Sequence, residues 1–302
     1  MFLAKNYKLI IKNYIIILCI LTIYYLIVRN NVLSNNSMSE WVINYQGGFV
    51  RRGFLGELIF QISNIINFNL RFSFLILQSL LYIFFYILIY NLLKNIKPNY
   101  LILLSIFSPL FIIFPVAELE ALGRKEILIF IALIVSINLH FKYLNNNLVI
   151  IFISIIYPIL ILVHESSIFY SFFFLSLILI TKFKFSYKFF FKLIMLSIPT
   201  FVCLYLVYSY PHSADDTARM CEELIKIGEE CGLATVFLSK SIGDHSLEVG
   251  WKLSHIIRYI FIFVVGFFGL IYLSLISEFN PKKINNLFCS NPFILHLIIL
   301  IL

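Results

Sequence analysis

The sequence predicts an all-α fold, a polytopic bundle of about eight or nine transmembrane helices. Composition, hydropathy and charge distribution support this class. Of the 302 residues, 61% are hydrophobic and only 13% are charged, and the mean hydropathy is +0.97. A composition of this kind excludes an ordinary soluble domain. We therefore interpret residues 1–302 as a single integral-membrane domain.

The apolar runs give eight predicted spans and the beginning of a ninth. They cover residues 10–28, 72–93, 99–117, 127–141, 148–163, 167–181, 193–210, 254–276 and 292–302. The runs at 127–141 and 148–163 are short for a hydrocarbon core about 30 Å thick, so their helices extend into flanking residues or are partly enclosed by protein. The last run stops without a flanking loop. We interpret this as a C-terminal truncation, and the alternative is a helix that ends inside the membrane.

The distribution of basic residues predicts the orientation of the chain. With the N-terminus in the cytoplasm, the segments on that side contain twelve lysines, no arginine and one acidic residue. The opposite side then holds eleven basic and fourteen acidic residues, including all seven arginines. Cytoplasmic loops carry the excess positive charge, so we expect a multi-pass protein of the inner (plasma) membrane with a cytoplasmic N-terminus. Arginine suits oxyanion recognition, which places the expected chemistry on the outer side.

The first outer segment, residues 40–57, reads EWVINYQGGFVRRGFLGE. Gly47 and Gly48 precede the adjacent Arg51 and Arg52. Glycine lets a ligand approach the backbone closely, and guanidinium groups present a planar fork of donors to phosphate or carboxylate. We predict that these four residues bind an anionic substrate at the membrane surface. The alternative is that the arginines only anchor the chain to lipid headgroups.

An amphipathic helix is predicted between residues 54 and 69, directly after this motif. Its apolar residues recur at three- and four-residue spacing: Leu55, Leu58, Ile59, Ile62, Ile65 and Ile66. Such a helix can lie along the outer membrane interface and hold the arginine loop at headgroup depth. An ordinary connecting helix is the alternative.

The second outer segment, residues 115–126, has five ionisable residues between two apolar runs: Glu118, Glu120, Arg124, Lys125 and Glu126. Charges near membrane depth are costly, and they mark functional sites unless they pair. Glu120 and Arg124 have the i,i+4 spacing of an ion pair on a helix, which is the structural interpretation. In the functional one, Arg124 or Lys125 contacts substrate.

The third outer segment is a tight turn, LVHESSIFY, with His164 next to Glu165. Histidine titrates near neutral pH, so both residues are candidate catalytic groups, as general base or charge stabiliser. Adjacent residues on a helix do not face each other, and we expect the two side chains to contact different partners. A helix-capping role is the structural alternative.

The fourth outer segment, residues 211–252, is the one larger outer loop. We predict a helix through the sequence MCEELIKIGEE, capped by Asp215 or Asp216 and ending at Gly232. The segment follows an apolar run and precedes the run at 254–276.

Two cysteines in this loop form a candidate disulfide. Cys221 and Cys231 would be about 15 Å apart along an unbroken helix, which is too far for a disulfide bond. If the chain turns near Gly228, they can bridge, and an oxidising outer compartment would preserve the bond. We therefore predict this disulfide together with the turn.

Three motifs, GGFVRRG, GRKE and HE, stand in successive outer segments. In this plan the chain resembles polytopic membrane proteins of bacterial surface-polysaccharide biosynthesis and, more broadly, GT-C-type glycosyltransferases and O-antigen polymerases or ligases. The resemblance implies sugar transfer from polyprenyl-(di)phosphate carriers at the extracytoplasmic face. The residues it implies are Arg51, Arg52 and Arg124 for the phosphates and Glu120, His164 or Glu165 for the base. The chain departs from the plan in lacking an Asp-Asp pair in its first outer segment and in having fewer spans than most polymerases.

The expected partners are a polyprenyl-phosphate-linked saccharide and membrane lipid, with no nucleic acid. No zinc spacing, Walker loop, GxGxxG or GxSxG motif occurs in the sequence, so no cofactor is expected, although a divalent metal is compatible with the residues. Three alternatives remain: a lipid-linked oligosaccharide flippase or transporter, a membrane acyltransferase that uses His164, and a non-catalytic scaffold. A transporter would carry ionisable residues along its spans, and few are found there.

Overall fold

The computed structural model describes residues 2–30, 36–94, 106–107, 112–117, 119, 121–143, 146–171, 173–174, 177, 187–209, 213–232, 235 and 238. Within these ranges the regular elements are helices and no strand occurs, as the sequence predicts. The long helices are α1 (Phe2–Asn30), α4 (Leu70–Leu93), α7 (Ile127–Tyr143), α8 (Asn146–Val163) and α10 (Tyr187–Ser209). The short ones are α2 (Asn36–Trp41), α3 (Gly53–Ile66), α6 (Phe114–Ala117), α11 (Ala214–Lys226) and the 3₁₀ helix η1 (Glu165–Tyr170).

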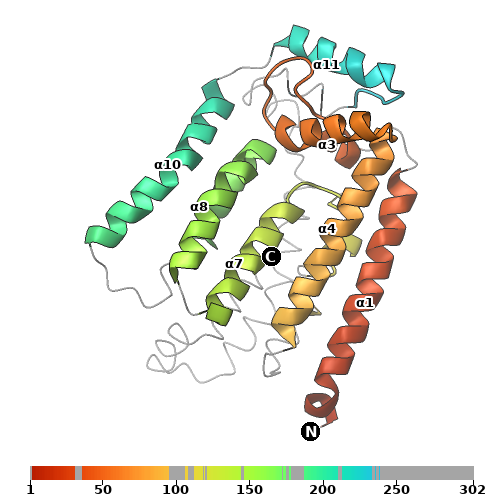
Figure 1. Ribbon diagram of the computed structural model, residues 1–302. Helices are drawn as coiled ribbons and strands as arrows, with labels where there is room; N and C mark the ends of the chain where they lie inside the picture. The colour runs from red at the N-terminus through yellow and green to blue at the C-terminus, as the bar shows by residue number, and fades with distance from the viewer. Residues whose placement is uncertain are drawn as a thin grey trace, which may run out of the picture.

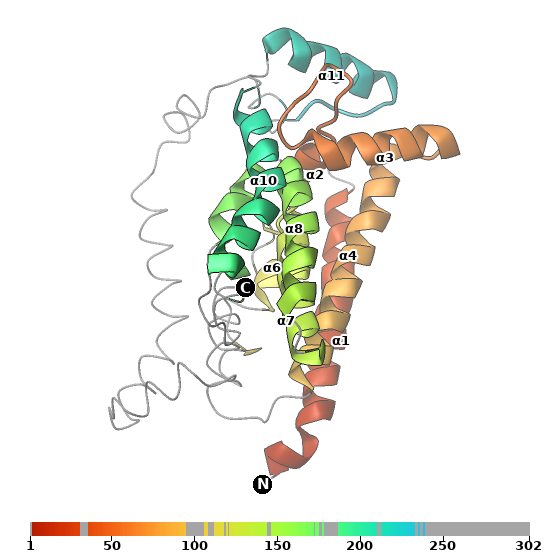
Figure 2. The same ribbon diagram turned by 60° about the vertical axis from the view of Figure 1, so that its left-hand side comes forward.

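The long helices stand side by side. Helix α1 packs against α4, α4 against α7, α7 against α8, and α8 against α10 (Figure 1). Helix α3 crosses one end of this row and α11 lies beyond it, while the N-terminus is at the opposite end (Figures 1 and 2). The described parts of the predicted outer segments, apart from residues 115–117 in α6, therefore gather at one end of the bundle.

Two apolar clusters hold this arrangement together. The larger one fills the spaces between the long helices and includes Ile11, Phe85, Ile134 and Ile161. The smaller one lies at the α3 end and surrounds the fully buried Trp41. It draws side chains from α2, α3, α4 and α11, including Phe74, Met220 and Leu224. Burial of these side chains fixes the loop around α3 to the end of the bundle.

Two helices are long and apolar enough to cross a membrane, Asn6–Asn30 within α1 and Leu70–Leu93. A third candidate exists if the bent pair Ile194–Ser209 and Ala214–Lys226 counts as one span. Helices α7 and α8 are apolar but shorter, as the sequence predicts for their runs. The runs at 254–276 and 292–302, most of the run at 99–117 and nearly half of the run at 167–181 lie outside the described residues. The structure thus supports two or three spans, and the predicted eight or nine stay a prediction.

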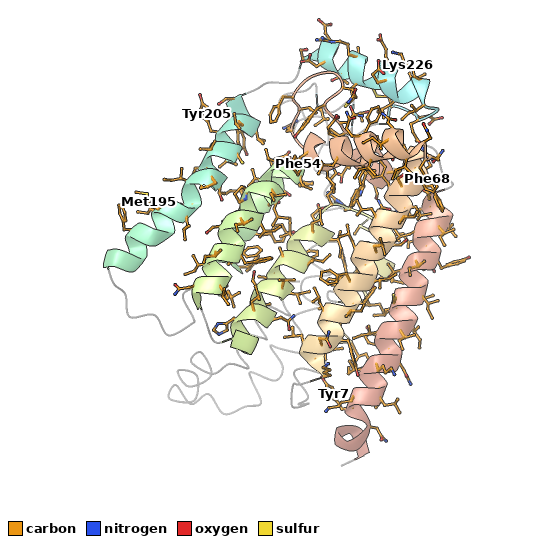
Figure 3. All side chains as sticks on the ribbon, in the orientation of Figure 1. Tyr7, Phe54, Phe68, Met195, Tyr205 and Lys226 are labelled. Atoms are coloured by element: carbon orange, nitrogen blue, oxygen red, sulfur yellow. A yellow bond between two sulfur atoms is a disulfide. The ribbon has the colours of Figure 1, made fainter. Side chains whose placement is uncertain are left out.

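Helix α3 occupies the position of the predicted amphipathic helix. It begins at Gly53 and ends at Ile66, earlier than predicted, because Asn67 adopts a left-handed conformation with φ of 53°. Gly53, Gly56, Phe60 and Ser63 are buried on its inner side. Four residues of the predicted apolar face are exposed on the other side of the helix: Leu58, Ile62, Ile65 and Ile66. Figure 3 shows Phe54 and Phe68 at the two ends of this helix, and Met195 and Tyr205 on the outward side of α10.

Helix α11 differs from the prediction at both ends. Ser213, and neither of the two aspartates, is the N-cap: its Oγ accepts a hydrogen bond from the Asp216 backbone at 3.1 Å, and the Asp216 carboxylate accepts one from the Ser213 backbone at 3.2 Å. The helix ends at Lys226 rather than at Gly232, because the chain turns at Gly228, whose φ is 79°.

This turn joins the two cysteines of the loop. Cys221 and Cys231 form a disulfide, with their Cα atoms 5.3 Å apart. The segment after the turn is held a second time, because Arg71 at the beginning of α4 makes an ion pair of 2.7 Å with the buried Glu229. The segment after α11 is therefore linked to the helix by the disulfide and to α4 by the ion pair.

Candidate functional site

Eight charged or titratable side chains from separate segments meet at the α3 end of the bundle. They come from α2, from the loop before α3, from the turn before α7, and from the junction of α8 and η1. We call them the charged cluster: Glu40, Arg51, Arg52, Arg124, Lys125, Glu126, His164 and Glu165. Ion pairs and hydrogen bonds connect its members across the three loops. Each member lies at a helix end or in a loop rather than within a long helix.

The shortest contacts in the cluster join Arg52 and Glu165. Arg52 Nε donates to the two carboxylate oxygens of Glu165 at 3.0 and 2.7 Å, and Arg52 Nη2 donates to Oε1 at 2.6 Å. Burial by itself would raise the pKa of Glu165, but the hydrogen bonds and charge of Arg52 outweigh it and lower the pKa to about 2. Glu165 is therefore a fixed carboxylate and a weak base.

Lys125 supports Arg52 from inside the protein. Its side chain is fully buried, and its Nζ donates to the Arg52 carbonyl oxygen at 2.6 Å. Arg52 has a φ of 66°, a left-handed conformation that is unfavourable for a residue other than glycine. Burial lowers the pKa of Lys125 to about 7. Lys125 thus holds the arginine loop in place and does not reach the surface, where the sequence placed it as a substrate contact.

Arg124 is the most exposed arginine of the cluster. Its side chain is 43% exposed, against 26% for Arg52 and 15% for Arg51. Its Nη2 lies 2.9 Å from Glu126 Oε1 and 3.8 Å from Glu40 Oε1. Its Nε is buried without a hydrogen-bond partner among the described residues.

The predicted pairing of Glu120 with Arg124 requires a helix through both residues, and Arg124 is not in a helix. Residues 121–126 form turns, and α7 begins only at Ile127. Glu118 and Glu120 lie outside the described residues. The partners that the structure gives to Arg124 are Glu40 and Glu126.

His164 faces two of these carboxylates. It is the N-cap of η1, with Nδ1 accepting the Ser166 backbone hydrogen bond at 3.3 Å and lying 2.7 Å from Ser166 Oγ. The capping role considered for this turn is thus present, and His164 and Glu165 contact different partners, as predicted. Its Nε2 points toward Glu126 Oε1, 3.9 Å away. Burial is the main cause that lowers the pKa of His164 to about 4 and raises the pKa of Glu40.

Three polar atoms in this part of the cluster are buried and lack a hydrogen-bond partner within the described residues: Glu40 Oε2, Glu126 Oε2 and His164 Nε2. One ligand-type atom from each of the three residues lies within 4.8 Å of the others. Buried polar atoms are normally paired, so three unpaired ones side by side require an explanation.

Gly47 is buried against α11, whereas Gly48 is exposed and touches only the Asp216 side chain of that helix. A Cβ atom on Gly47 would overlap the backbone carbonyl oxygen of Asp216. Gly48 has a φ of 129° and lies against the Asp216 side chain. At Gly47, the close approach that the sequence analysis attributes to a ligand is made by α11 of the same chain.

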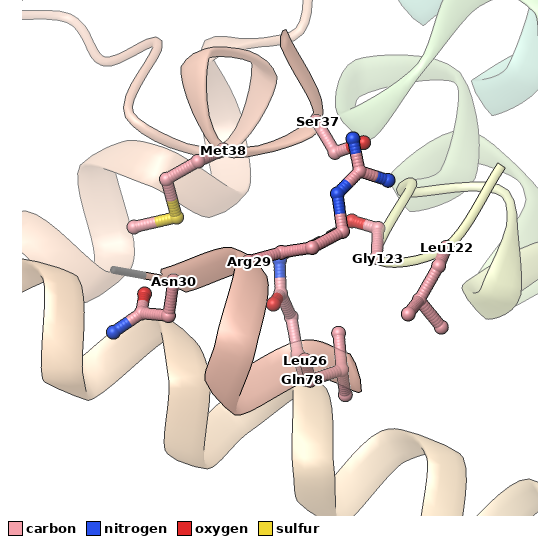
Figure 4. A pocket seen from close by; sticks show the side chains of 8 residues that line it. All are labelled: Leu26, Arg29, Asn30, Ser37, Met38, Gln78, Leu122 and Gly123. Atoms are coloured by element: carbon pink, nitrogen blue, oxygen red, sulfur yellow. Dashed lines mark hydrogen bonds between the residues drawn. The ribbon is translucent and has the colours of Figure 1, made fainter. Parts of the chain in front are cut away.

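A small pocket lies beside the cluster, between the ends of α1 and α4 (Figure 4). Gly123 lines it, and the Gly123 carbonyl accepts hydrogen bonds from Trp41 Nε1 and from Gln78 Nε2. The other lining residues are Leu26, Arg29, Asn30, Ser37, Met38, Gln78 and Leu122. No member of the charged cluster lines this pocket, so we do not assign the chemistry of the cluster to it.

Six of the residues predicted for the site lie together: Arg51, Arg52, Arg124, Lys125, His164 and Glu165. Sequence reasoning left out Glu40 and Glu126, although Glu126 ends the GRKE motif and Glu40 begins the first outer segment. Glu126 could have been found from the sequence, because it lies two residues after Arg124. Glu40 approaches Arg124 only in the fold. No family model matches this chain, and comparisons with curated proteins and with solved structures also find no match.

Proposed function

We propose that the chain is a membrane glycosyltransferase or polymerase that acts at the extracytoplasmic face on polyprenyl-(di)phosphate-linked sugars in surface-polysaccharide synthesis. One observation carries the proposal: arginines and carboxylates from separate segments converge at one end of an apolar helical bundle, and two of these carboxylates keep one buried oxygen without a partner among the described residues. A lipid-linked sugar diphosphate presents its charged group at the same depth, at the boundary between the lipid and water.

Arg124 is the first candidate for binding the diphosphate. It has an exposed side chain and an unpaired Nε, and its contact with Glu40 is long at 3.8 Å. Arg51 contacts Glu165 at a similarly long 3.9 Å. A diphosphate can replace such long contacts, whereas the short bidentate pair of Arg52 with Glu165 stays intact. In this proposal Arg124 and Arg51 contact the phosphates, and Arg52 orders the loop.

The carboxylate side of the cluster would serve the acceptor. In the transfer, the acceptor hydroxyl oxygen forms a bond to the anomeric carbon, and the bond from that carbon to the phosphate oxygen breaks. The electron pair leaves with the lipid phosphate, which the arginines stabilise. The hydroxyl proton goes to a group among Glu40, Glu126 and His164, which each bring one ligand-type atom within 4.8 Å of the others. Glu165 is excluded from this role because both of its oxygens accept from Arg52.

The orientation forms part of the proposal, with the N-terminus in the cytoplasm and the cluster outside. Two observations support it. The lysine-rich segments belong to the opposite side in this orientation. The disulfide between Cys221 and Cys231 lies at the cluster end, and disulfides persist in oxidising compartments outside the cytoplasm.

The test is complementation of a source cell that lacks this protein, with polymer length and composition as the readout. Arg124→Ala and Arg51→Ala should abolish or shorten the polymer at normal protein levels. Arg219→Ala is the matched control, because Arg219 is an exposed arginine of α11 that pairs with Asp216 in the same helix. Wild-type polymer from the Arg51→Ala, Arg124→Ala double variant would overturn the proposal.

A second measurement separates a transferase from a flippase. Purified protein in detergent should release polyprenyl phosphate or diphosphate from a lipid-linked oligosaccharide when an acceptor is present, and Arg124→Ala should not. A flippase needs two membrane sides and gives no product in detergent.

A further inference from the structure

The atoms of Glu40, Glu126 and His164 form a pre-arranged ligand set. Glu40 comes from α2, Glu126 precedes α7, and His164 follows α8, so three segments supply one ligand each. The side chain of His164 is only 4% exposed, and its Nε2, which has no hydrogen-bond partner among the described residues, lies 3.9 Å from Glu126 Oε1. Each carboxylate keeps one buried oxygen without a partner among the described residues.

From this arrangement we propose that Glu40, Glu126 and His164 bind a divalent cation with mixed nitrogen and oxygen ligation, Mn²⁺ or Zn²⁺. Leaving three buried polar atoms without hydrogen-bond partners is costly. A cation shared by the three would satisfy all of them at once. The inference goes beyond the proposed reaction and modifies it: a bound cation would lower the pKa of the acceptor hydroxyl, and a carboxylate of Glu40 or Glu126, rather than His164, would take its proton. Cation binding itself is measured without any substrate.

The ligand types restrict the cation. Imidazole nitrogen favours Zn²⁺ and other transition metals, and carboxylate oxygen also suits Mn²⁺, whereas Mg²⁺ and Ca²⁺ prefer oxygen alone. Atoms bound at about 2.0–2.2 Å from a metal lie roughly 3–4 Å from one another. The ligand atoms here lie within 4.8 Å, so a side-chain movement of about 1 Å completes the site. Three protein ligands leave further positions for water or a phosphate oxygen.

Ser166 supplies the support that a histidine ligand needs. In the arrangement described, Nδ1 of His164 accepts the Ser166 backbone hydrogen bond, so the neutral ring carries its proton on Nε2. A cation at Nε2 would require the tautomer with its proton on Nδ1, which would then donate a hydrogen bond to Ser166 Oγ, 2.7 Å away, instead of accepting the one from the Ser166 backbone. A hydrogen bond at the second nitrogen commonly orients metal-binding histidines. Ser166 is thus a positioning residue for the site.

The surrounding guanidinium groups bind the other oxygens of the same carboxylates. Arg124 contacts Oε1 of both Glu126 and Glu40, and Arg52 contacts Oε1 of Glu40. This leaves the Oε2 atoms for the cation but adds positive charge nearby. We therefore expect cation affinity to increase when inorganic diphosphate is present, because the anion offsets this charge.

The experiment uses the full chain purified in detergent, free of affinity tag and stripped of metal with a chelator. Mn²⁺ binding is followed by the loss of the free-ion signal in electron paramagnetic resonance, and Zn²⁺ binding by elemental analysis after dialysis. We expect one cation per chain. His164→Gln, Glu126→Gln and Glu40→Gln should each weaken binding at least tenfold, and Ser166→Ala should weaken it less. Pulsed resonance of bound Mn²⁺ should show nitrogen coupling that His164→Gln removes.

Glu223→Gln is the matched control, since it makes the same charge change on the exposed side of α11 and should bind as the wild type does. Thermal unfolding without metal shows whether each variant is folded, and Glu126→Asp replaces Glu126→Gln if the latter is not. Absence of stoichiometric binding of both cations by the wild type would overturn the inference. So would wild-type affinity in the folded His164→Gln protein. Either result leaves the transferase proposal standing, because that proposal is tested on polymer and product.

Discussion

Arg52 and Glu165, 113 residues apart in the chain, form a bidentate ion pair that joins the loop before α3 to the junction of α8 and η1. Arg52 stands directly before α3 with a left-handed backbone, and Glu165 is the first residue of η1. The pair therefore connects two helix beginnings, and the rest of the charged cluster is arranged around it. Two of our predictions concern the contacts that hold this loop, and two concern α11 and α3.

The Arg52–Glu165 pair is expected to stabilise the fold measurably. Replacing one partner leaves the other charge largely buried, which costs 3–5 kcal/mol in fully buried pairs. Because the Arg52 side chain is 26% exposed, we expect Arg52→Gln or Glu165→Gln to lower the free energy of unfolding by about 2 kcal/mol. The double variant should lose less than the sum of the two. Chemical unfolding of the four proteins in detergent measures this coupling.

The matched cycle uses Glu223 and Lys226, an exposed pair on α11 with a similarly short contact. We expect no coupling there, because solvent screens exposed pairs. Additive losses in the Arg52–Glu165 cycle would mean that the pair is no more than a surface contact.

Gly47→Ala is expected to displace α11 from the arginine loop. The added Cβ would overlap the Asp216 carbonyl oxygen, and a backbone atom within a helix cannot move aside alone. Overpacking of this kind costs about 1–3 kcal/mol. The expected result is faster tryptic cleavage at Arg219 and Lys226 and a lower melting temperature. Gly228→Asn is the control, because no atom lies within 4 Å of its Cβ position and asparagine tolerates a positive φ. Unchanged proteolysis in Gly47→Ala would contradict this packing.

The disulfide is expected to hold the end of α11 on the bundle. Breaking it with Cys231→Ser should destabilise this segment by about 2–3 kcal/mol, the amount expected from closing a short loop. Trypsin should then cleave the segment faster, although the Arg71–Glu229 pair still retains part of it. Peptide maps with and without reductant identify the bond. Cys203→Ser, at a free cysteine, is the control, and two free thiols at positions 221 and 231 would refute the bond.

The sequence predicts elements better than it predicts what surrounds them. Spacing of apolar residues locates α3, and the turn at Gly228 is anticipated because glycine adopts a positive φ without cost. The ends of α3 and α11 differ by a few residues, because Asn67 and Ser213 act as caps through local hydrogen bonds that compete with the predicted ones.

The glycines and the acids of the site illustrate the limit. Gly47 indicates that something approaches the backbone closely, but the sequence does not distinguish a ligand from Asp216 of the same chain. Glu40 belongs to no motif and Glu126 is the last residue of GRKE, and what marks both acids is their contacts with Arg124 and, for Glu126, with His164 in the folded chain. Lys125 is a candidate substrate contact in the sequence. In the fold its side chain is buried and donates a hydrogen bond to the Arg52 carbonyl oxygen.

The exposed apolar side of α3 is expected to contact lipid. The side chains of Ile65 and Ile66 are 79% and 65% exposed, while the opposite side of the helix is buried on the bundle. Removing one isoleucine side chain from water is favourable by about 1.5–3 kcal/mol of transfer free energy. Several such side chains on one helix face therefore favour contact with lipid over contact with water. Ile65→Trp in liposomes should therefore be quenched strongly by brominated lipids, measured against the wild-type tryptophans.

Ile225→Trp is the matched control for this measurement, because Ile225 is 63% exposed but lies on α11, beyond α3 from the bundle. Its quenching should be weak if the membrane surface lies at the level of α3. Equal and weak quenching at both positions would place α3 in water, and the charged cluster beside it could then no longer meet the headgroup of a lipid-linked substrate. Strong quenching at Ile65 alone would place Arg51 and Arg124 near the membrane surface. Arg51 lies in the loop that leads into α3 and contacts Glu165, and Arg124 contacts Glu40 of the same cluster.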